Sequence, residues 1–341
     1  MIRLGVIGLG VGKHHMQGIV RGGKAEIAAI CDTNEELLKK VAEEFRVANY
    51  STDYREMLKD ETIDGILVTT PDHIHLEQVC AALRAGKHVL CEKPLALHMD
   101  ECREMMKVAE ESGKIFMVGQ VCRVTPGFVM AKKIIDEGML GDLYFIESEY
   151  AHDYSHMSET NWRRDPAIQR HGVTGGGCHA VDLIRWLTGE DPVEVCSYST
   201  HKALVDWPCD DSTIAIMKFN EGLKGKVYVS TGCQREYTMR TVVYGTKGTI
   251  VVDNKSNLMT LYVNEFGGMD KLVGKNMNRI AHQIPVSIES HNFTAEISEF
   301  CNCIENNLPA SIPAIEGAKT VAVCEAIVRS SATGQIEKVQ Y

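Results

Sequence analysis

The chain has 341 residues, of which 44% are hydrophobic and 24% are charged, and its formal net charge is −10. This length exceeds what one average hydrophobic core supports, so we expect two domains. The negative charge argues against nucleic acid or an anionic membrane as a main partner, because both require a basic protein surface.

The sequence also indicates a compartment. No apolar run approaches the roughly 20 residues that span a bilayer, and the first eight residues lack the apolar core and cleavage site of a signal peptide. The twelve cysteines are scattered without a Cys-x-x-Cys pair, which favours reduced and mostly buried thiols. We therefore expect a cytoplasmic protein without a membrane partner.

The first third of the chain alternates short apolar runs with helical patterns. Strands are predicted over 3–7, 26–31, 66–68, 87–91 and 115–118, and helices over 15–21, 35–45, 75–84 and 100–112. Buried strands separated by helices imply right-handed crossovers and a parallel sheet with helices on both faces. We expect a doubly wound α/β domain over residues 1–121.

After about residue 120 the spacing changes, and strands predominate from residue 142 onward. Strands are predicted over 213–219, 225–230, 240–244 and 249–252, and helices over 126–137, 181–187, 291–305 and 315–330. The β-branched residues, partial alternation and short turns are typical of antiparallel strands. We expect an α+β domain over residues 122–341, with an open, predominantly antiparallel sheet that has helices on one face.

A glycine-rich turn follows the first predicted strand. The cofactor-binding candidates in it are Gly8, Gly10, Val11 and Gly12. Glycine lets the backbone turn tightly and approach a pyrophosphate, and a helix N-terminus adds unpaired N–H groups and partial positive charge. The Gly-x-Gly-x-Gly spacing is one residue shorter than the usual Gly-x-Gly-x-x-Gly.

Asp32 ends the second predicted strand, at the spacing expected of an acid that binds the ribose hydroxyls of a dinucleotide. A carboxylate repels a 2′-phosphate, and no arginine or lysine lies between Asp32 and Lys39. The pattern therefore predicts NAD, with NADP disfavoured. The alternative is a helix-capping aspartate beside a structural glycine turn.

Three further stretches resemble the family of glucose-fructose oxidoreductase, inositol dehydrogenase and rhizopine catabolism, abbreviated Gfo/Idh/MocA. They are Thr70 to His75, Gly86 to Leu95 with its Glu92-Lys93-Pro94 segment, and Gly176 to Leu183. The resemblance runs essentially from end to end. It implies an NAD-binding Rossmann domain and an open C-terminal sheet that forms a homodimer or homotetramer. It also implies substrates that are sugars, sugar derivatives or cyclitols.

The resemblance places Lys93 beside the nicotinamide and the reacting hydroxyl, where it hydrogen-bonds the substrate oxygen and shares its proton. It also places several neighbours along the cofactor path: Thr70, Pro71, His73, His75, Glu92, Pro94 and Gln120. Two roles are possible for Glu92: structural support of the segment or a contact with the cofactor.

The second catalytic element of the family is Asp-x-Gly-x-His, and it matches Gly177 and His179. The resemblance makes His179 the base or proton relay, although a packed core histidine is the alternative. Gly175 stands where the family has aspartate, so another acid must orient the ring if one is used. Asp182 and Asp153 are the two candidates.

Polar and aromatic side chains early in the second domain are candidates for sugar binding. They are Arg123, Asp153, Tyr154, Trp162 and Arg163, together with Lys93 and His179. The alternative for each charged residue is that it is a solvated loop residue that does not bind the sugar. His152 and His156 are four residues apart, which suits a metal only on a helix. We expect extended structure there and predict no metal.

These observations predict an NAD-dependent dehydrogenase of carbohydrate metabolism that oxidises a secondary hydroxyl of a sugar, sugar derivative or cyclitol. Two alternatives stay open. One is a transient redox cycle on tightly bound NAD that enables glycoside elimination or hydrolysis. The other is a non-catalytic, nicotinamide-sensing protein.

Overall fold

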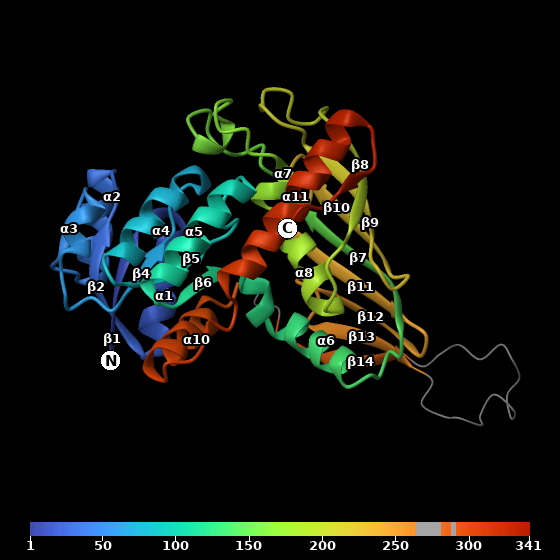
Figure 1. Cartoon of the computed structure of the whole chain (residues 1–341), viewed down its shortest axis with the longest axis horizontal. Helices are drawn as coiled ribbons and strands as arrows, with labels where there is room; N and C mark the ends of the chain where they lie inside the picture. The colour runs from blue at the N-terminus through green and yellow to red at the C-terminus, as the bar shows by residue number, and fades with distance from the viewer. Residues whose placement is uncertain (264–280, 288–290) are drawn as a thin grey trace, which may run out of the picture. The chain divides into compact units, whose positions relative to one another are not determined.

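The computed structural model describes residues 1–263, 281–287 and 291–341. The chain divides into two compact units, one of residues 1–121, 291–322 and 341, the other of residues 122–290 and 323–340 (Figure 1). The sequence-based division placed everything after residue 121 in the second domain. Residues 291–322 instead pack with the first unit, because helix α10 (Phe293–Glu305) lies against α1 (Leu9–Gly22).

The first unit is built on a parallel sheet with strand order β3-β2-β1-β4-β5-β6. Its strands are β1 (Ile2–Ile7), β2 (Ala25–Cys31), β3 (Tyr50–Ser51), β4 (Gly65–Val68), β5 (His88–Glu92) and β6 (Phe116–Gly119). Its other helices are α2 (Glu35–Phe45), α3 (Tyr54–Leu58), α4 (His75–Arg84), α5 (Met99–Ser112) and the short 3-10 helix η1 (Asp72–Ile74). The predicted doubly wound parallel sheet is confirmed.

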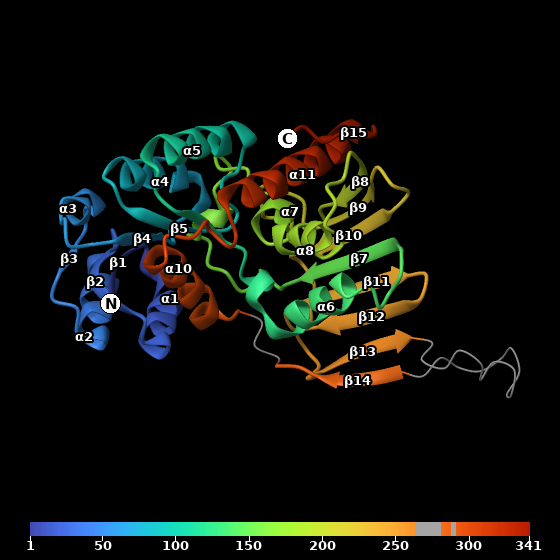
Figure 2. The same ribbon diagram turned by 60° about the horizontal axis from the view of Figure 1, so that its bottom comes forward.

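The strand order of this sheet reverses between β1 and β4, which are hydrogen-bonded neighbours. Every residue of β4 is buried, as expected of a strand with helices on both faces (Figure 2). In open α/β sheets, ligands bind outside the carboxyl ends of the strands at such a switch point. The chain thus brings the ends of β1 and β4, at Ile7 and Val68, to one edge of the sheet.

The second unit is built on a larger sheet with strand order β14-β13-β12-β11-β7-β10-β9-β8-β15. Its strands are β7 (Leu143–Ala151), β8 (Glu194–Thr200), β9 (Ser212–Lys218), β10 (Lys224–Ser230), β11 (Thr238–Gly245), β12 (Gly248–Asp253), β13 (Leu258–Val263), β14 (Ala281–Pro285) and β15 (Glu337–Lys338). Its helices are α6 (Pro126–Asp136), α7 (Gly172–Gly175), α8 (Cys178–Thr188), the 3-10 helix η3 (Trp162–Arg164) and the second half of α11 (Ala314–Thr333). A further 3-10 helix, η2 (Val121–Val124), lies where the two units meet in the chain.

Among the described strand pairs of this sheet, β7–β10 is parallel and the others are antiparallel. The predicted predominantly antiparallel sheet is therefore confirmed. Helices α6 and α8 pack on one of its faces. Strand β9 alternates accordingly: Ala215 and Met217 are buried, whereas Ile214 and Ile216 are 42% and 45% exposed on the opposite face.

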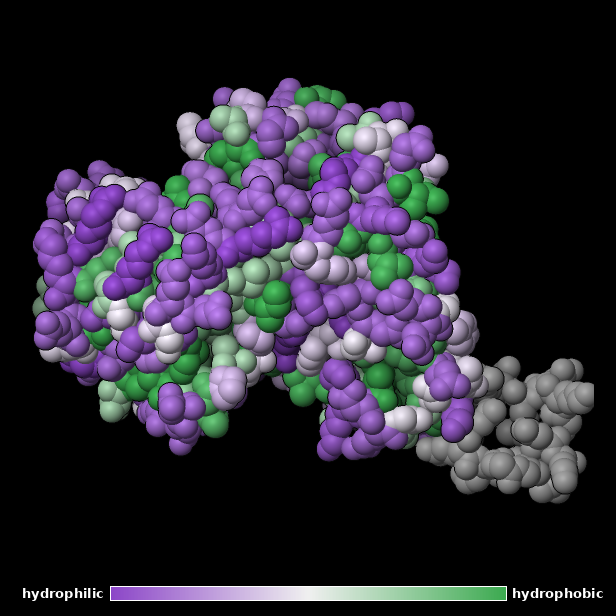
Figure 3. Space-filling model, viewed as in Figure 1, coloured by the Kyte–Doolittle hydropathy of each residue, from purple (hydrophilic) through white to green (hydrophobic). Residues whose placement is uncertain are grey.

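Helix α1 begins at Leu9 rather than at residue 15, so the glycine-rich segment forms the first turn of the helix. On the face shown in Figure 3, hydrophilic residues predominate and hydrophobic residues lie in small separate groups. In the described part of the chain, no helix has the length and apolar character required to cross a membrane.

Candidate functional site

The glycine-rich turn begins at Gly8, whose φ of 87° favours glycine. A Cβ on Gly8 would lie 2.9 Å from the carbonyl oxygen of Thr69, and one on Gly12 would lie 2.5 Å from the Oγ1 of Thr69. A Cβ on Gly10, in contrast, would meet no atom within 4 Å. Gly8 and Gly12 are thus required by packing on the end of β4, whereas Gly10 leaves the first turn of α1 open to a ligand.

The side chain of Asp32 holds the backbone at the start of α1. Its Oδ2 accepts a hydrogen bond from the N–H of Leu9 at 2.7 Å, and its Oδ1 accepts one from the N–H of Asn34 at 2.8 Å. The capping alternative is therefore realised. Each carboxylate oxygen accepts more than one hydrogen bond, so capping and ribose binding are compatible.

The loop after β4 is tied to β1 and to the start of α4. Thr69 Oγ1 donates to the carbonyl oxygens of Ile7 and Gly8, at 2.9 and 2.6 Å. Thr70 Oγ1 donates to Oε1 of Gln78 at 2.6 Å. This loop also contains Pro71, which is half-buried, and His73, which is exposed.

His75 has a structural role that differs from its predicted cofactor contact. Its side chain is 0% exposed. Its Nε2 lies 3.0 Å from the carbonyl oxygen of Thr70, and its Nδ1 lies 3.1 Å from that of Pro94. The ring therefore joins the loop after β4 to the loop after β5, and its predicted cofactor contact stays a prediction.

The Glu92-Lys93-Pro94 segment ends β5, and its Lys93–Pro94 peptide bond is cis. Glu92 is buried and its Oε2 accepts from the backbone N–H of Lys93 at 3.0 Å, while its Oε1 lies 2.8 Å from Nε2 of His15. Glu92 thus fixes the backbone from which the half-buried Lys93 projects. Gln120, just beyond β6, is 1% exposed, and its Oε1 has no hydrogen-bond partner among the described residues.

His179, in the first turn of α8, is 1% exposed. Its Nδ1 lies 3.6 Å from the Sγ of Cys122, and its ring stacks on that of Tyr150 with the centroids 6.4 Å apart. Lys93 belongs to the first unit and His179 to the second. Their predicted catalytic pairing stays a prediction.

The guanidinium of Arg170 lies against Gly175. A Cβ on Gly175 would collide with the guanidinium of Arg170, whose Nη2 donates to the carbonyl oxygen of Gly175 at 3.1 Å. Arg170 is itself 6% exposed. A cation therefore lies over the position where the family pattern has an acid. The sequence contains no signal for this contact, because Arg170 lies in an irregular segment.

The two acids predicted to orient His179 are both engaged elsewhere. Both oxygens of Asp182 accept from Arg123, at 2.7 and 2.8 Å, in a buried bidentate pair. Hydrogen bonds from the side chain and backbone of Ser155 lower the pKa of Asp153, whose Oδ1 accepts the Ser155 N–H at 2.8 Å. Arg123 thereby joins η2 to α8, and its predicted contact with substrate stays a prediction.

An aromatic cluster surrounds the end of β7. The hydroxyl of Tyr150 lies 3.0 Å from that of Tyr154 and 3.1 Å from Nδ1 of His152. The Tyr237 ring centroid lies 5.6 Å from that of Tyr150. Burial, followed by the influence of Tyr154 and Tyr237, raises the pKa of Tyr150 well above its usual value, so its hydroxyl keeps its proton and can donate it.

Tyr150 is the main residue of this cluster that the sequence analysis missed. Tyr150 is the second-to-last residue of β7 and belongs to no recognisable sequence motif. The alternation of side chains along a strand would nevertheless have placed it on the buried face of the sheet. The predicted Trp162 and Arg163 do lie together, with the guanidinium carbon of Arg163 at 4.5 Å from the Trp162 ring centroid. His152 and His156 have ring centroids 6.5 Å apart, and no metal-binding group of three or more such side chains occurs among the described residues.

Comparisons with known proteins address the whole chain. A family model described as an oxidoreductase family with an NAD-binding Rossmann fold matches residues 2–120, and the GFO/IDH/MocA C-terminal domain model matches residues 128–251. A levoglucosan dehydrogenase of Pseudarthrobacter phenanthrenivorans is 30% identical over 65% of this chain and 63% of that protein. The inositol 2-dehydrogenase of Salmonella typhimurium is 23% identical over 99% of this chain and 97% of that protein.

The structure of a levoglucosan dehydrogenase in complex with NADH has a TM-score of 0.89, with 24% identity and 99% of each chain covered. This likeness confirms the fold of both units. The two family models together span more than half of the chain, and the first of them describes an NAD-binding Rossmann fold. The chain therefore belongs to the Gfo/Idh/MocA family of NAD-binding oxidoreductases.

Proposed function

We propose that this protein is an NAD-dependent dehydrogenase that oxidises a secondary hydroxyl of a sugar, sugar derivative or cyclitol. The observation that supports this most is the open first turn of α1, where a Cβ on Gly10 would meet no atom within 4 Å, beside the carboxylate of Asp32. The similar proteins named levoglucosan dehydrogenase and inositol 2-dehydrogenase support the substrate class.

The residues of the first unit fit the cofactor. The first turn of α1 would hold the pyrophosphate, and Asp32 would bind the adenosine ribose. The Thr70–Pro71 backbone would line the path toward the nicotinamide. When bound, NAD accepts the hydride that leaves the carbinol carbon.

Lys93 and His179 handle the hydroxyl proton in this proposal. Lys93 hydrogen-bonds the substrate oxygen, and its backbone is held by Glu92 at 3.0 Å. His179, whose Nδ1 lies 3.6 Å from the Sγ of Cys122, relays the proton. The Arg123–Asp182 pair supports the helix that carries His179. The side chains of Asp153, Tyr154, Trp162 and Arg163 bind the sugar.

Absorbance of reduced nicotinamide tests the proposal directly. Purified protein with a panel of sugars, glycosides and cyclitols should reduce NAD but not NADP. Lys93→Ala should lower kcat by a factor of about 10² to 10⁴, the usual contribution of a positioned acid–base group. Lys107→Ala, at an exposed lysine of α5, should leave it unchanged. Full activity in Lys93→Ala would contradict the proposal.

A transient redox cycle is the second candidate, and the replacement of the family's acid by the Arg170 guanidinium over Gly175 favours it. Here NAD would be reduced and reoxidised within one turnover while a glycoside is eliminated or hydrolysed. Mass spectrometry would then show glycoside consumption without net absorbance change. The absence of turnover in both measurements would favour a nicotinamide sensor.

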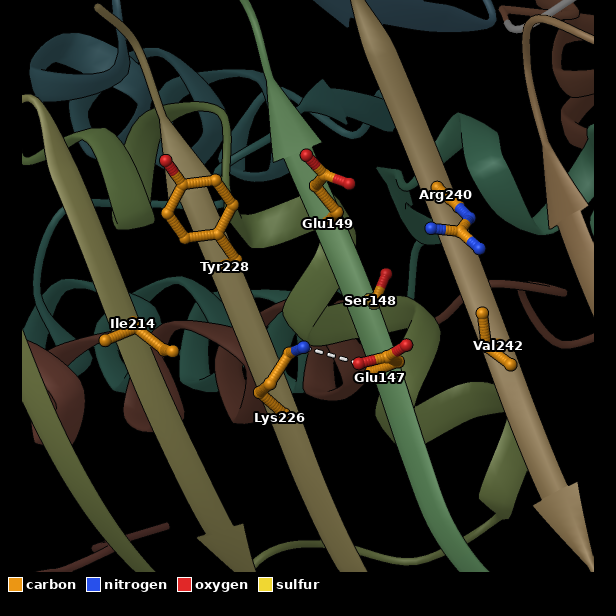
Figure 4. A pocket seen from close by; sticks show the side chains of 8 residues that line it. All are labelled: Glu147, Ser148, Glu149, Ile214, Lys226, Tyr228, Arg240 and Val242. Atoms are coloured by element: carbon orange, nitrogen blue, oxygen red, sulfur yellow. Dashed lines mark hydrogen bonds and ion pairs between the residues drawn. The ribbon is translucent and has the colours of Figure 1, made fainter. Parts of the chain in front are cut away.

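We also propose that copies of the chain associate through the exposed face of the larger sheet. Figure 4 shows Ile214 of β9 beside Lys226 and Tyr228 of the neighbouring β10 on that face, and Ile214 and Tyr228 are both exposed. An ion pair between Lys226 and Glu147 lies in the same surface. Exposed apolar residues gathered on one sheet face mark interaction sites, which supports a homodimer or homotetramer.

A cytoplasmic location completes the proposal. All twelve cysteines are free thiols, and most of them are buried. Disulfides are rare in reducing compartments, so the free thiols support this location. Fractionation of cells that express a tagged chain would test it.

A further inference from the structure

The first unit contains a buried group of ionisable side chains from three separate elements. They are His15 on α1, Glu92 at the end of β5 and Glu296 on α10. The two histidine nitrogens face opposite carboxylates: Nε2 lies 2.8 Å from Oε1 of Glu92, and Nδ1 lies 3.7 Å from Oε2 of Glu296. His15 and Glu296 are both 0% exposed.

Several polar atoms of this group have no hydrogen-bond partner among the described residues. They are both carboxyl oxygens of Glu296, the Nδ1 of His15 and the nearby Oε1 of Gln120. Glu296 Oε1 lies beside the end of β6, 3.6 Å from the position that a Cβ on Gly119 would take. An unpaired ionised carboxylate is very costly in such a position, so a neutral acid is favoured.

The two carboxyl groups have opposite protonation preferences. Burial raises the pKa of Glu92, but the hydrogen bond and charge of His15, together with Lys93, outweigh it and lower this pKa to about 2. Burial and then the charge of Glu92 raise the pKa of Glu296 well above its usual value, against a smaller lowering by Lys93. Such separation of two carboxyl groups in one site is typical of functional acids.

We propose that Glu296 and His15 are positioning residues for Lys93: Glu296 stays protonated and faces His15, which donates to the ionised Glu92, which in turn fixes the backbone of Lys93. The N–H of His15 Nε2 donates to Oε1 of Glu92, whose Oε2 accepts from the N–H of Lys93. Helix α10 thereby supports the lysine through two intervening side chains. This inference rests on the proposed function of Lys93.

The titratable groups that act on Glu296 lie on α1 and at the end of β5, whereas the end of β6 contributes Gly119. His15 faces it from α1, and Glu92 and Lys93 affect it from the end of β5. Two further histidines, His14 and His291, stack on the ring of Phe293 at the start of α10. Protonation of Glu296 removes one negative charge from the Glu92–His15–Glu296 group that lies beside Lys93. Ionisation at alkaline pH would add a second negative charge and disturb the position of Lys93.

Infrared spectroscopy and pH profiles test the inference together. At neutral pH the wild-type protein should show the carbonyl band of a buried protonated carboxylic acid. That band should disappear in Glu296→Gln and persist in Glu305→Gln, a control at an exposed residue of the same helix. Wild-type kcat should fall at alkaline pH as Glu296 ionises, and Glu296→Gln should lack this fall because its amide cannot ionise.

The kcat values of two variants distinguish the polar contribution of Glu296 from its contribution to packing. Glu296→Gln should keep kcat within about twofold, because the amide is neutral, has nearly the same shape as the protonated acid and keeps a polar group facing Nδ1 of His15. Glu296→Leu should lower kcat by about tenfold, because it replaces the polar group that faces Nδ1 of His15 at 3.7 Å by an apolar one, with the Kd for NADH unchanged.

A band that survives in Glu296→Gln, or an alkaline fall that persists in that variant, would overturn the inference, and neither depends on whether Glu296→Leu folds. Either result would overturn the role of Glu296 without contradicting the proposed dehydrogenase activity of the wild-type protein. Failure of the proposed function would instead appear as turnover that does not depend on Lys93.

Discussion

At the residue scale, Asp32 combines a structural role with a proposed cofactor contact. Its carboxylate caps the start of α1 through the N–H of Leu9. Asp32→Asn keeps an acceptor oxygen for this cap but removes the negative charge that repels a 2′-phosphate. We therefore expect the Kd ratio of NADPH to NADH to fall by about tenfold, since hydrogen bonds to charged groups contribute about 1.5–3 kcal/mol.

Fluorescence titration with both reduced nucleotides measures this ratio, and thermal unfolding checks that the cap survives. Asp100→Asn makes the same charge change at an exposed position of α5 and should leave the ratio unchanged. If the ratio stays constant in Asp32→Asn, the carboxylate does not select NAD.

Single residues also mark the limit of what the sequence predicts. Asp32 and the glycines are predictable because their spacing follows from the shape of a dinucleotide. The guanidinium of Arg170 over Gly175, and Glu296 facing His15 at 3.7 Å, are not. Residues 15 and 296 are far apart in the chain, and only tertiary packing brings them together. Likewise, His75 matches a family motif, yet its burial gives it a structural role.

At the element scale, two glycines in the first turn of α1 should have different roles: Gly12 in the stability of the fold and Gly10 in cofactor binding. A Cβ on Gly12 would press on Thr69 Oγ1, which donates to the carbonyl oxygens of Ile7 and Gly8. Gly12→Ala should therefore lower the free energy of unfolding by about 1–3 kcal/mol, the usual cost of overpacking. Gly10→Ala is its matched control, because nothing lies within 4 Å of the added methyl group.

Gly10→Ala should keep or raise the free energy of unfolding by about 0.5–1 kcal/mol, as alanine favours helix. It should nevertheless weaken NADH binding by about tenfold or more, equal to about 1.4 kcal/mol, because the methyl group enters the space proposed for the pyrophosphate. Denaturant unfolding and NADH titration of both variants measure these effects. Equal affinity in Gly10→Ala and the wild type would exclude a pyrophosphate at this turn.

Among the elements, the long amphipathic helices were the most predictable. Helices α2 and α4 have the bounds that their apolar spacing predicted. Helix α1 was predicted to start too late, since glycines are usually unfavourable inside helices, whereas here packing on β4 requires them. The short strands β3 and β15 have two residues each, too few for an alternating pattern.

At the scale of the whole molecule, the chain does not divide at a single point. Residues 291–322 return to the first unit, so the segment that contains Glu296 completes the core around His15. A reading of the sequence in order cannot predict this return, because α10 has the same amphipathic character whichever unit it covers. The proposed support of Lys93 by Glu296 depends on it.

The exposed face of the larger sheet gives the last prediction. Ile216 is 45% exposed on β9, beside the apolar and paired charged residues of the same face. If this face joins two copies, a lysine there places two desolvated charges close to the symmetry axis or against apolar partners, and association weakens strongly. Light scattering at micromolar concentration should show a dimer or tetramer for the wild type and a shift toward monomer for Ile216→Lys.

Val129→Lys is the matched control, because Val129 is similarly exposed, at 43%, but lies on α6, which packs on the other face of the sheet. It should leave the molar mass unchanged. A wild-type monomer, or an equal effect of both variants, would contradict association through this face. An assembly that dissociates only in Ile216→Lys, with an unchanged NADH Kd, would show that the larger sheet mediates assembly independently of cofactor binding in the first unit.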